Sequence, residues 1–135
     1  MAQDILGTVI SLKAADGSIC AWRVATVSAK NTADLWQTST SKILGLTTND
    51  ASNAGDAVGI IINGIGRAVC GASVSVGAVV CPMTDTAKIT EITVDNFTMS
   101  TTSLFAKSVG VALQSGSTNS VISVLVMPNN IGKIG

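Results

Sequence analysis

The sequence predicts an all-β fold, a small sandwich or barrel of about nine or ten short antiparallel strands with at most one short helix. Apolar runs rich in Val, Ile and Ala are short, and turn residues interrupt them roughly every eight to twelve positions. No long stretch repeats with the 3.6-residue period of an amphipathic helix. A length of 135 residues suggests one domain. Within it we expect an N-terminal hairpin and variable loop at 1–41, a core β meander at 42–127 and a tail at 128–135.

The first two strands are expected at Ile5–Lys13 and Ser18–Val27, joined as a hairpin around Asp16-Gly17. Ser28–Ser41 is polar and has the weakest pattern, with room for one helical turn near Trp36. A short strand follows at Lys42–Thr47.

The stretch Asp56–Cys81 organises the predicted fold. Asn63-Gly64 separates two apolar runs, and this pair is favoured in type I′ hairpin turns because both residues tolerate positive φ. A third run, Val76–Cys81, completes a predicted three-stranded meander. Further strands are expected at Ala87–Val94, Ser108–Gln114 and Ser120–Met127, the last buried on both faces and ended by Pro128. Asp95–Lys107 is expected to be a loop or extra strand over the core.

Composition limits the classes of function. Apolar residues make up 47% of the chain, charged residues only 12% and aromatic residues 3%, and the net charge is zero. Few charges and much apolar surface suit a subunit packed against copies of itself or a larger assembly. Scattered cations argue against nucleic-acid binding, and no apolar run is long enough for a membrane helix. The N-terminus lacks the basic region of a signal peptide.

The sequence offers no catalytic or cofactor motif. It has no His, which excludes Ser-His-Asp and Cys-His sites. Most of the eight acidic residues fall in predicted turns, where Asp bonds the local backbone. Cys20, Cys70 and Cys81 are interpreted as small buried hydrophobic residues, although Cys70 and Cys81 end predicted strands that could lie close together. We therefore expect no enzyme activity, no metal and no cofactor. A site built from distant carboxylates or from a cysteine remains the less favoured alternative.

Four residues are candidates for contacts with a partner: Trp22, Arg23, Trp36 and Arg67. Tryptophan is enriched at interface hot spots, but a plug over the end of the core is the favoured interpretation of Trp36. Each arginine either lies on an outward face or pairs with a carboxylate of another subunit.

The order of several motifs from Lys42 to Met127 resembles the capsid decoration, or cement, proteins of tailed bacteriophages. The residues that carry the resemblance are Ile43-Leu-Gly-Leu46, Gly55-Asp56 before an apolar strand, the Gly64 turn, Ala72-Ser-Val-Ser-Val-Gly-Ala-Val-Val80, and Val109-Gly-Val-Ala-Leu113 before the closing strand.

The resemblance implies a small β protein bound to the outside of an icosahedral head, contacting the major capsid protein as a homotrimer and stabilising the shell. It implies a virion location after synthesis in the host cytoplasm. The family has no catalytic residues, and the matching glycines, Gly55, Gly64, Gly77 and Gly110, would be fold-forming positions. Asn63 joins them as a turn residue through the predicted Asn63-Gly64 hairpin. The alternatives are a phage tail or fibre-base protein, or a cell-surface adhesion module.

Overall fold

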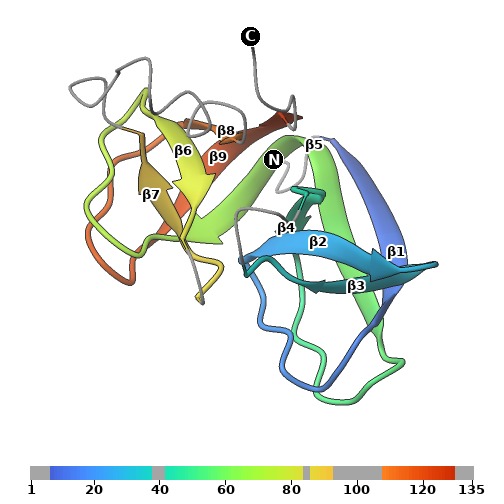
Figure 1. The fold of residues 1–135 in the computed structure, drawn as a ribbon. Helices are drawn as coiled ribbons and strands as arrows, with labels where there is room; N and C mark the ends of the chain where they lie inside the picture. The colour runs from blue at the N-terminus through green and yellow to red at the C-terminus, as the bar shows by residue number, and fades with distance from the viewer. Residues whose placement is uncertain (1–6, 38–41, 84–85, 93–107, 130–135) are drawn as a thin grey trace, which may run out of the picture.

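The computed structural model describes residues 7–37, 42–83, 86–92 and 108–129, which form strands and no helix (Figure 1). The predicted all-β fold class is confirmed. Nine strands join in one sheet in the order β1-β3-β2-β4-β5-β9-β8-β6-β7. Their bounds are β1 (Thr8–Ala14), β2 (Val24–Ala29), β3 (Thr32–Leu35), β4 (Gly45–Thr47), β5 (Ala57–Val69), β6 (Val79–Pro82), β7 (Ile89–Glu91), β8 (Ser108–Ala112) and β9 (Val121–Asn129). The described part of the chain holds no helix with the length and hydropathy of a membrane span.

The first five strands close into a small barrel, because β1 pairs with β5 as well as with β3. We call this the first barrel. Its β1–β3 pair is parallel and short, joining Lys13 to Thr32 and Ala14 to Ala33. The other pairs in this barrel are antiparallel. Closure leaves fewer free strand edges than an open sheet of the same size would have.

The second half of the sheet curls in the same way. Strands β5, β9, β8, β6 and β7 pair in that order, all antiparallel. Cys70, which directly follows β5, forms a parallel bridge with Ile89 of β7. The backbone N–H of Gly71 donates to the carbonyl oxygen of Ile89 at 2.8 Å. These contacts close the ring that we call the second barrel.

The predicted hairpin at Asn63-Gly64 is wrong, because the chain runs straight through these residues as the single strand β5. Up to Asn63 this strand pairs with β1 and β4, and from Gly64 onward it pairs with β9. Gly64 has φ +105, a conformation that glycine adopts without steric cost. The Asn-Gly pair therefore marks the point where β5 passes from one barrel to the other, visible as the long curved green strand in Figure 1.

The predicted hairpin between Ile5–Lys13 and Ser18–Val27 is also wrong. Strand β1 pairs with β5 and β3, and only the end of the second segment, β2, is a strand. The actual N-terminal hairpin joins β2 to β3 through Lys30 and Asn31, within a region expected to be the least structured. Asn31 takes φ +57, a left-handed conformation that asparagine tolerates better than most residues.

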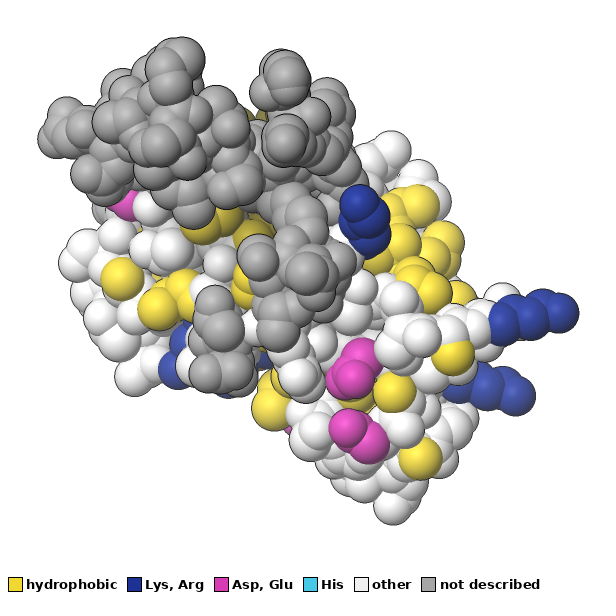
Figure 2. All heavy atoms as spheres, in the orientation of Figure 1, with side chains coloured by type: hydrophobic (Ala, Val, Ile, Leu, Met, Phe, Trp, Pro, Cys, Tyr) yellow, Lys and Arg dark blue, Asp and Glu magenta, His cyan; other side chains and the backbone are white. Residues whose placement is uncertain are grey.

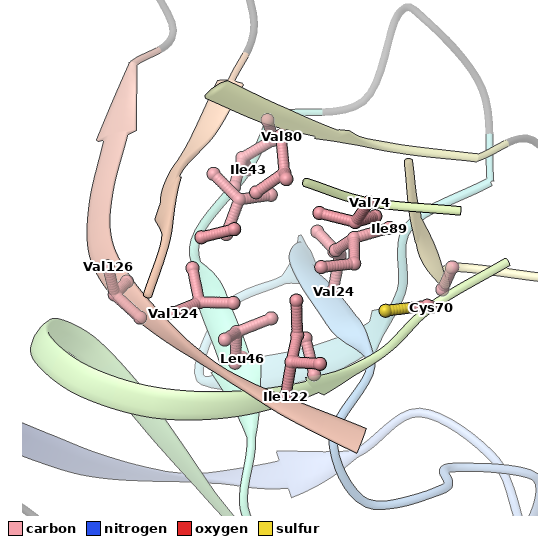
Figure 3. Packing of buried hydrophobic residues seen from close by; sticks show 14 of the residues in the cluster. Val24, Ile43, Leu46, Cys70, Val74, Val80, Ile89, Ile122, Val124 and Val126 are labelled. Atoms are coloured by element: carbon pink, nitrogen blue, oxygen red, sulfur yellow. The ribbon is translucent and has the colours of Figure 1, made fainter. Parts of the chain in front are cut away.

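Two groups of buried side chains stabilise the barrels. The smaller core fills the first barrel with Ala14, Ile19, Ala25, Ala33, Ala51, Val58 and Ile60. The larger core fills the second barrel and extends to β2 and β4 of the first, as Figure 3 shows for Val24, Leu46 and Val124. Its members are Val24, Trp36, Ile43, Leu46, Ile61, Ala68, Cys70, Val74, Val80, Ala87, Ile89, Val109, Ala112, Ile122, Val124 and Val126. The larger core therefore joins the two barrels.

Several local predictions are confirmed and others need correction. Strands occur in four further predicted segments, as β4, β6, β7 and β8, although β6 extends one residue past its predicted end to Pro82. Gly55 (φ +90) and Gly77 (φ +85) lie in turns, whereas Gly64 and Gly110 lie inside strands. Pro128 does not end β9, which extends to Asn129. The prediction for Asp95–Lys107 lies outside the described residues, and the division of the chain at 41 and 127 stays a prediction.

Candidate interaction surface

The acidic side chains of the described residues support the backbone. All five of them accept a backbone N–H: Asp16 from Ser18, Asp34 from Leu35, Asp50 from Ala21, Asp56 from Asn53 and Glu91 from Ser75. Two hydrogen bonds from Ser18, first its hydroxyl and then its N–H, lower the pKa of Asp16 below the usual value. No group of three or more metal-ligating side chains gathers among the residues that the structure describes.

The three cysteines are free thiols in different surroundings. Cys20 is exposed, Cys70 is buried and Cys81 is half-buried. The interpretation of all three as buried small residues is therefore confirmed for Cys70, holds only in part for Cys81 and is wrong for Cys20. Burial raises the pKa of both the Cys70 and the Cys81 thiol, which disfavours the reactive thiolate.

We expect Cys20 to react first when the native protein is treated with a thiol reagent at neutral pH. Access is the reason, since Cys20 is exposed and Cys70 lies in the larger core. Quenching at intervals and mapping the label by mass spectrometry measures the order. Labelling of Cys70 at the same rate as Cys20 without denaturant would contradict the described packing.

Trp22 lies in a tight turn where the two barrels meet. It takes φ +63, a conformation that costs a non-glycine residue about 1–2 kcal/mol. Its N–H donates to the Thr47 carbonyl at 2.8 Å, and its own carbonyl accepts from Val69 N–H at 3.0 Å. These bonds tie the turn to β4 and to the end of β5. Trp22 as a whole residue is 38% exposed.

Thr47 is almost completely buried, and its side chain holds this turn in place. Its hydroxyl donates to the Cys20 carbonyl at 2.6 Å and accepts from Arg23 N–H at 3.0 Å. Replacing Thr47 with valine keeps the shape but leaves both backbone groups without this partner, so we expect a loss of about 1–3 kcal/mol in unfolding free energy. Urea denaturation measures it. Thr47→Ser keeps the hydroxyl, and equal stability of the two variants would exclude this role.

Arg23 follows Trp22 and was predicted inside a strand, but it lies just before β2. Its Nη1 donates to the Thr86 carbonyl at 3.2 Å, while its buried Nε has no hydrogen-bond partner. A backbone hydrogen bond joins the same two segments, because Val24 N–H donates to the Ala87 carbonyl at 2.9 Å. Trp22 and Arg23, which are neighbours in the sequence, thus lie on a turn that contacts both barrels, and their role in binding a partner stays a prediction.

Trp36 differs from Trp22 and Arg23 because its side chain is buried. It is only 5% exposed and belongs to the larger core. The favoured interpretation of Trp36 as a plug over the end of the core agrees with this burial. Trp36 directly follows β3, and no helical turn forms at this position.

Arg67 lies on a different surface, the outer face of the second barrel. Strand register places one aliphatic row across four strands of this face, from Val79 (β6) through Val111 (β8) and Leu125 (β9) to Ile65 (β5). Met127 and Val121 extend it along β9, and Arg67 extends it along β5. We call these seven residues the aliphatic band.

The aliphatic band corrects the prediction that β9 is buried on both faces. Ile122, Val124 and Val126 point into the larger core, but Val121 and Met127 are 40% and 53% exposed. Sequence reasoning missed the band because the apolar residues on the outward face of Ser120–Met127 were expected to be buried inside the chain. The failure of Ser120–Met127 to alternate apolar and polar residues was the available indication. Figure 2 shows that hydrophobic side chains also reach the surface in several places on the face seen in Figure 1.

Comparisons with known proteins show a similarity of fold. Neither the family models nor the curated sequences that were compared include a match to this chain. Among solved structures, one described as the head fiber gp8.5 N base in bacteriophage phi29 is similar with a TM-score of 0.64 and 11% sequence identity. The similarity covers 95% of this chain and 98% of that one. At this identity it establishes a shared fold along almost the whole of both chains.

Proposed function

We propose that this chain is a structural protein of a bacteriophage virion that binds the outer surface of the icosahedral head. The observation that carries the proposal is the similarity of fold to the base of a phage head fibre, which covers nearly all of both chains. The resemblance of the Lys42–Met127 motifs to capsid decoration proteins supports the same location independently of that comparison.

The surface chemistry supports a role in assembly. Aliphatic side chains that remain exposed on one chain, here Val79, Val121 and Met127, are typical of surfaces that another protein covers. The described carboxylates accept backbone N–H groups in a supporting role. In the proposed role the chain contacts the major capsid protein as a homotrimer, and many weak contacts multiplied by symmetry hold it on the shell.

Decoration is the finer function that we propose, in which the bound chain stabilises the shell against rupture. A fibre base is the second candidate, and the similarity of fold to the phi29 head fiber base favours it. An adhesion module is less favoured, because glycan platforms usually combine exposed aromatic side chains, and of the two tryptophans Trp36 is buried and only Trp22 is exposed.

Composition of purified particles tests the proposal. We expect the chain in virions at a copy number set by the symmetry of the head, and its absence from particles would reject the proposed function. Particles made without the chain separate the two candidates. If these heads rupture at a lower temperature than normal heads, the chain is a decoration protein. If they have normal stability but have also lost the rest of a head fibre, the chain is a fibre base.

A further inference from the structure

Arg67 is the one charged side chain of the aliphatic band. Its neighbours along the outward face of β5 are Ile65 and Val69, and its cross-strand partner on β9 is Ser123. Arg67 is exposed, and no residue that the structure describes gives its guanidinium group a hydrogen bond or ion pair. A cation surrounded by aliphatic side chains gains most from a carboxylate that approaches together with an apolar surface.

Nothing in the described part of this chain supplies that carboxylate on the same face. The outward positions of β5, β6, β8 and β9 near Arg67 carry aliphatic, Ser, Asn or Cys side chains. The acidic side chains whose positions are described accept backbone N–H groups outside the band, for example Asp50 from Ala21 and Glu91 from Ser75.

This distribution of charge argues against a second copy as the occupant of the band. A twofold contact presents the same surface from both chains. Such a contact would bury the Arg67 guanidinium groups of both chains among aliphatic side chains. The described residues of the band include no carboxylate to pair with them, and burial of an unpaired charge is strongly unfavourable. A cyclic trimer joins two different surfaces, so it does not require the band to meet itself.

We propose that the aliphatic band is the surface that binds the head shell, through an apolar patch of the shell protein that carries a carboxylate paired with Arg67. The identity of the partner rests on the proposed function. Aliphatic contacts from Val79, Leu125 and Met127 supply most of the affinity, and the bidentate pairing of Arg67 fixes the orientation of the chain on the shell.

Binding of purified variants to heads that lack the chain tests this assignment. We expect Arg67→Glu to weaken binding by about tenfold or more, because it places two carboxylates together in a desolvated contact. Lys13→Glu makes the same charge change on the exposed outer side of β1 and should leave binding within about twofold, as expected for a charge outside the contact. Met127→Ser and Val27→Ser form a second matched pair, since the two parent side chains are 53% and 50% exposed but only Met127 belongs to the band.

A photoreactive residue at 127 identifies the occupant directly, with the same residue at 27 as control. A crosslink from 127 to the shell protein is the expected result. A crosslink from 127 to a second copy overturns the assignment, as does binding that is insensitive to both Arg67→Glu and Met127→Ser. If heads do not bind the unaltered chain at all, the proposed function fails as well, so the two failures are distinguishable. Unchanged melting temperatures of the variants confirm that they fold.

Discussion

Replacement of Leu46 by alanine is expected to lower the free energy of unfolding by about 2–5 kcal/mol. Leu46 is fully buried in the larger core, where β4 of the first barrel meets β9 of the second, and lies close to Ile122 and Val124 in Figure 3. Removing its side chain leaves a cavity where the two barrels meet, and the paired strands around it can collapse only partly. Urea denaturation of the purified chain measures the change.

Leu113→Ala is the matched control, since it deletes the same atoms from a side chain that is 41% exposed. Its cost should stay below about 1 kcal/mol. Equal losses for the two variants would mean that the larger core does not join the barrels.

Replacement of Gly110 by alanine is expected to cost about 3 kcal/mol or more, at the upper end of the usual overpacking range. Gly110 lies in β8 between Val80 of β6 and Val126 of β9, next to a register shift. An added Cβ would collide with the backbone carbonyl oxygen of Leu125, which no change of rotamer can move. The strands would have to separate, and thermal or urea unfolding would report the loss.

Gly77→Ala is the control for this substitution. Gly77 has φ +85 but open space around the position of a Cβ, so only the backbone conformation is penalised, by about 1–2 kcal/mol. A Gly110→Ala variant no less stable than Gly77→Ala would show that β8 and β9 do not approach as described.

The fold class was predictable because it depends on features that are local in sequence. Short β-branched runs separated by turn residues correspond to β4, β6, β7 and β8. The pairing of strands was not predictable, because local patterns do not determine which edges meet. Nothing near Lys13 indicates its parallel neighbour Thr32, and nothing near Cys70 indicates its bridge to Ile89.

Asn63-Gly64 shows why a strong local preference failed. The same tolerance of positive φ that suits a hairpin turn also suits a bend within a long strand. Here β5 pairs with β1 and β4 in the part before the bend and with β9 in the part after it, and these pairings keep the chain in one strand through the bend. Tertiary pairing therefore decided between two structures that the dipeptide allows equally.

The sequence suggested candidate contact residues but not the surface on which they lie. Tryptophan and arginine types led to Trp22 and Arg23, which are neighbours in the sequence and lie on one turn, and to Arg67, which lies apart from them on the aliphatic band. The band itself depends on strand register, which places Val79, Val111, Leu125 and Ile65 in one row although they are distant in sequence. Whether these residues contact a partner stays a prediction.

A reconstruction of the phage particle at a resolution that traces the chain is the most direct test of the proposed head-binding role. We predict density for this double-barrel fold on the outer surface of the head, with the β5–β9–β8–β6 face against the shell protein. Particles whose heads carry no such density, or that place the chain elsewhere, would contradict the proposal.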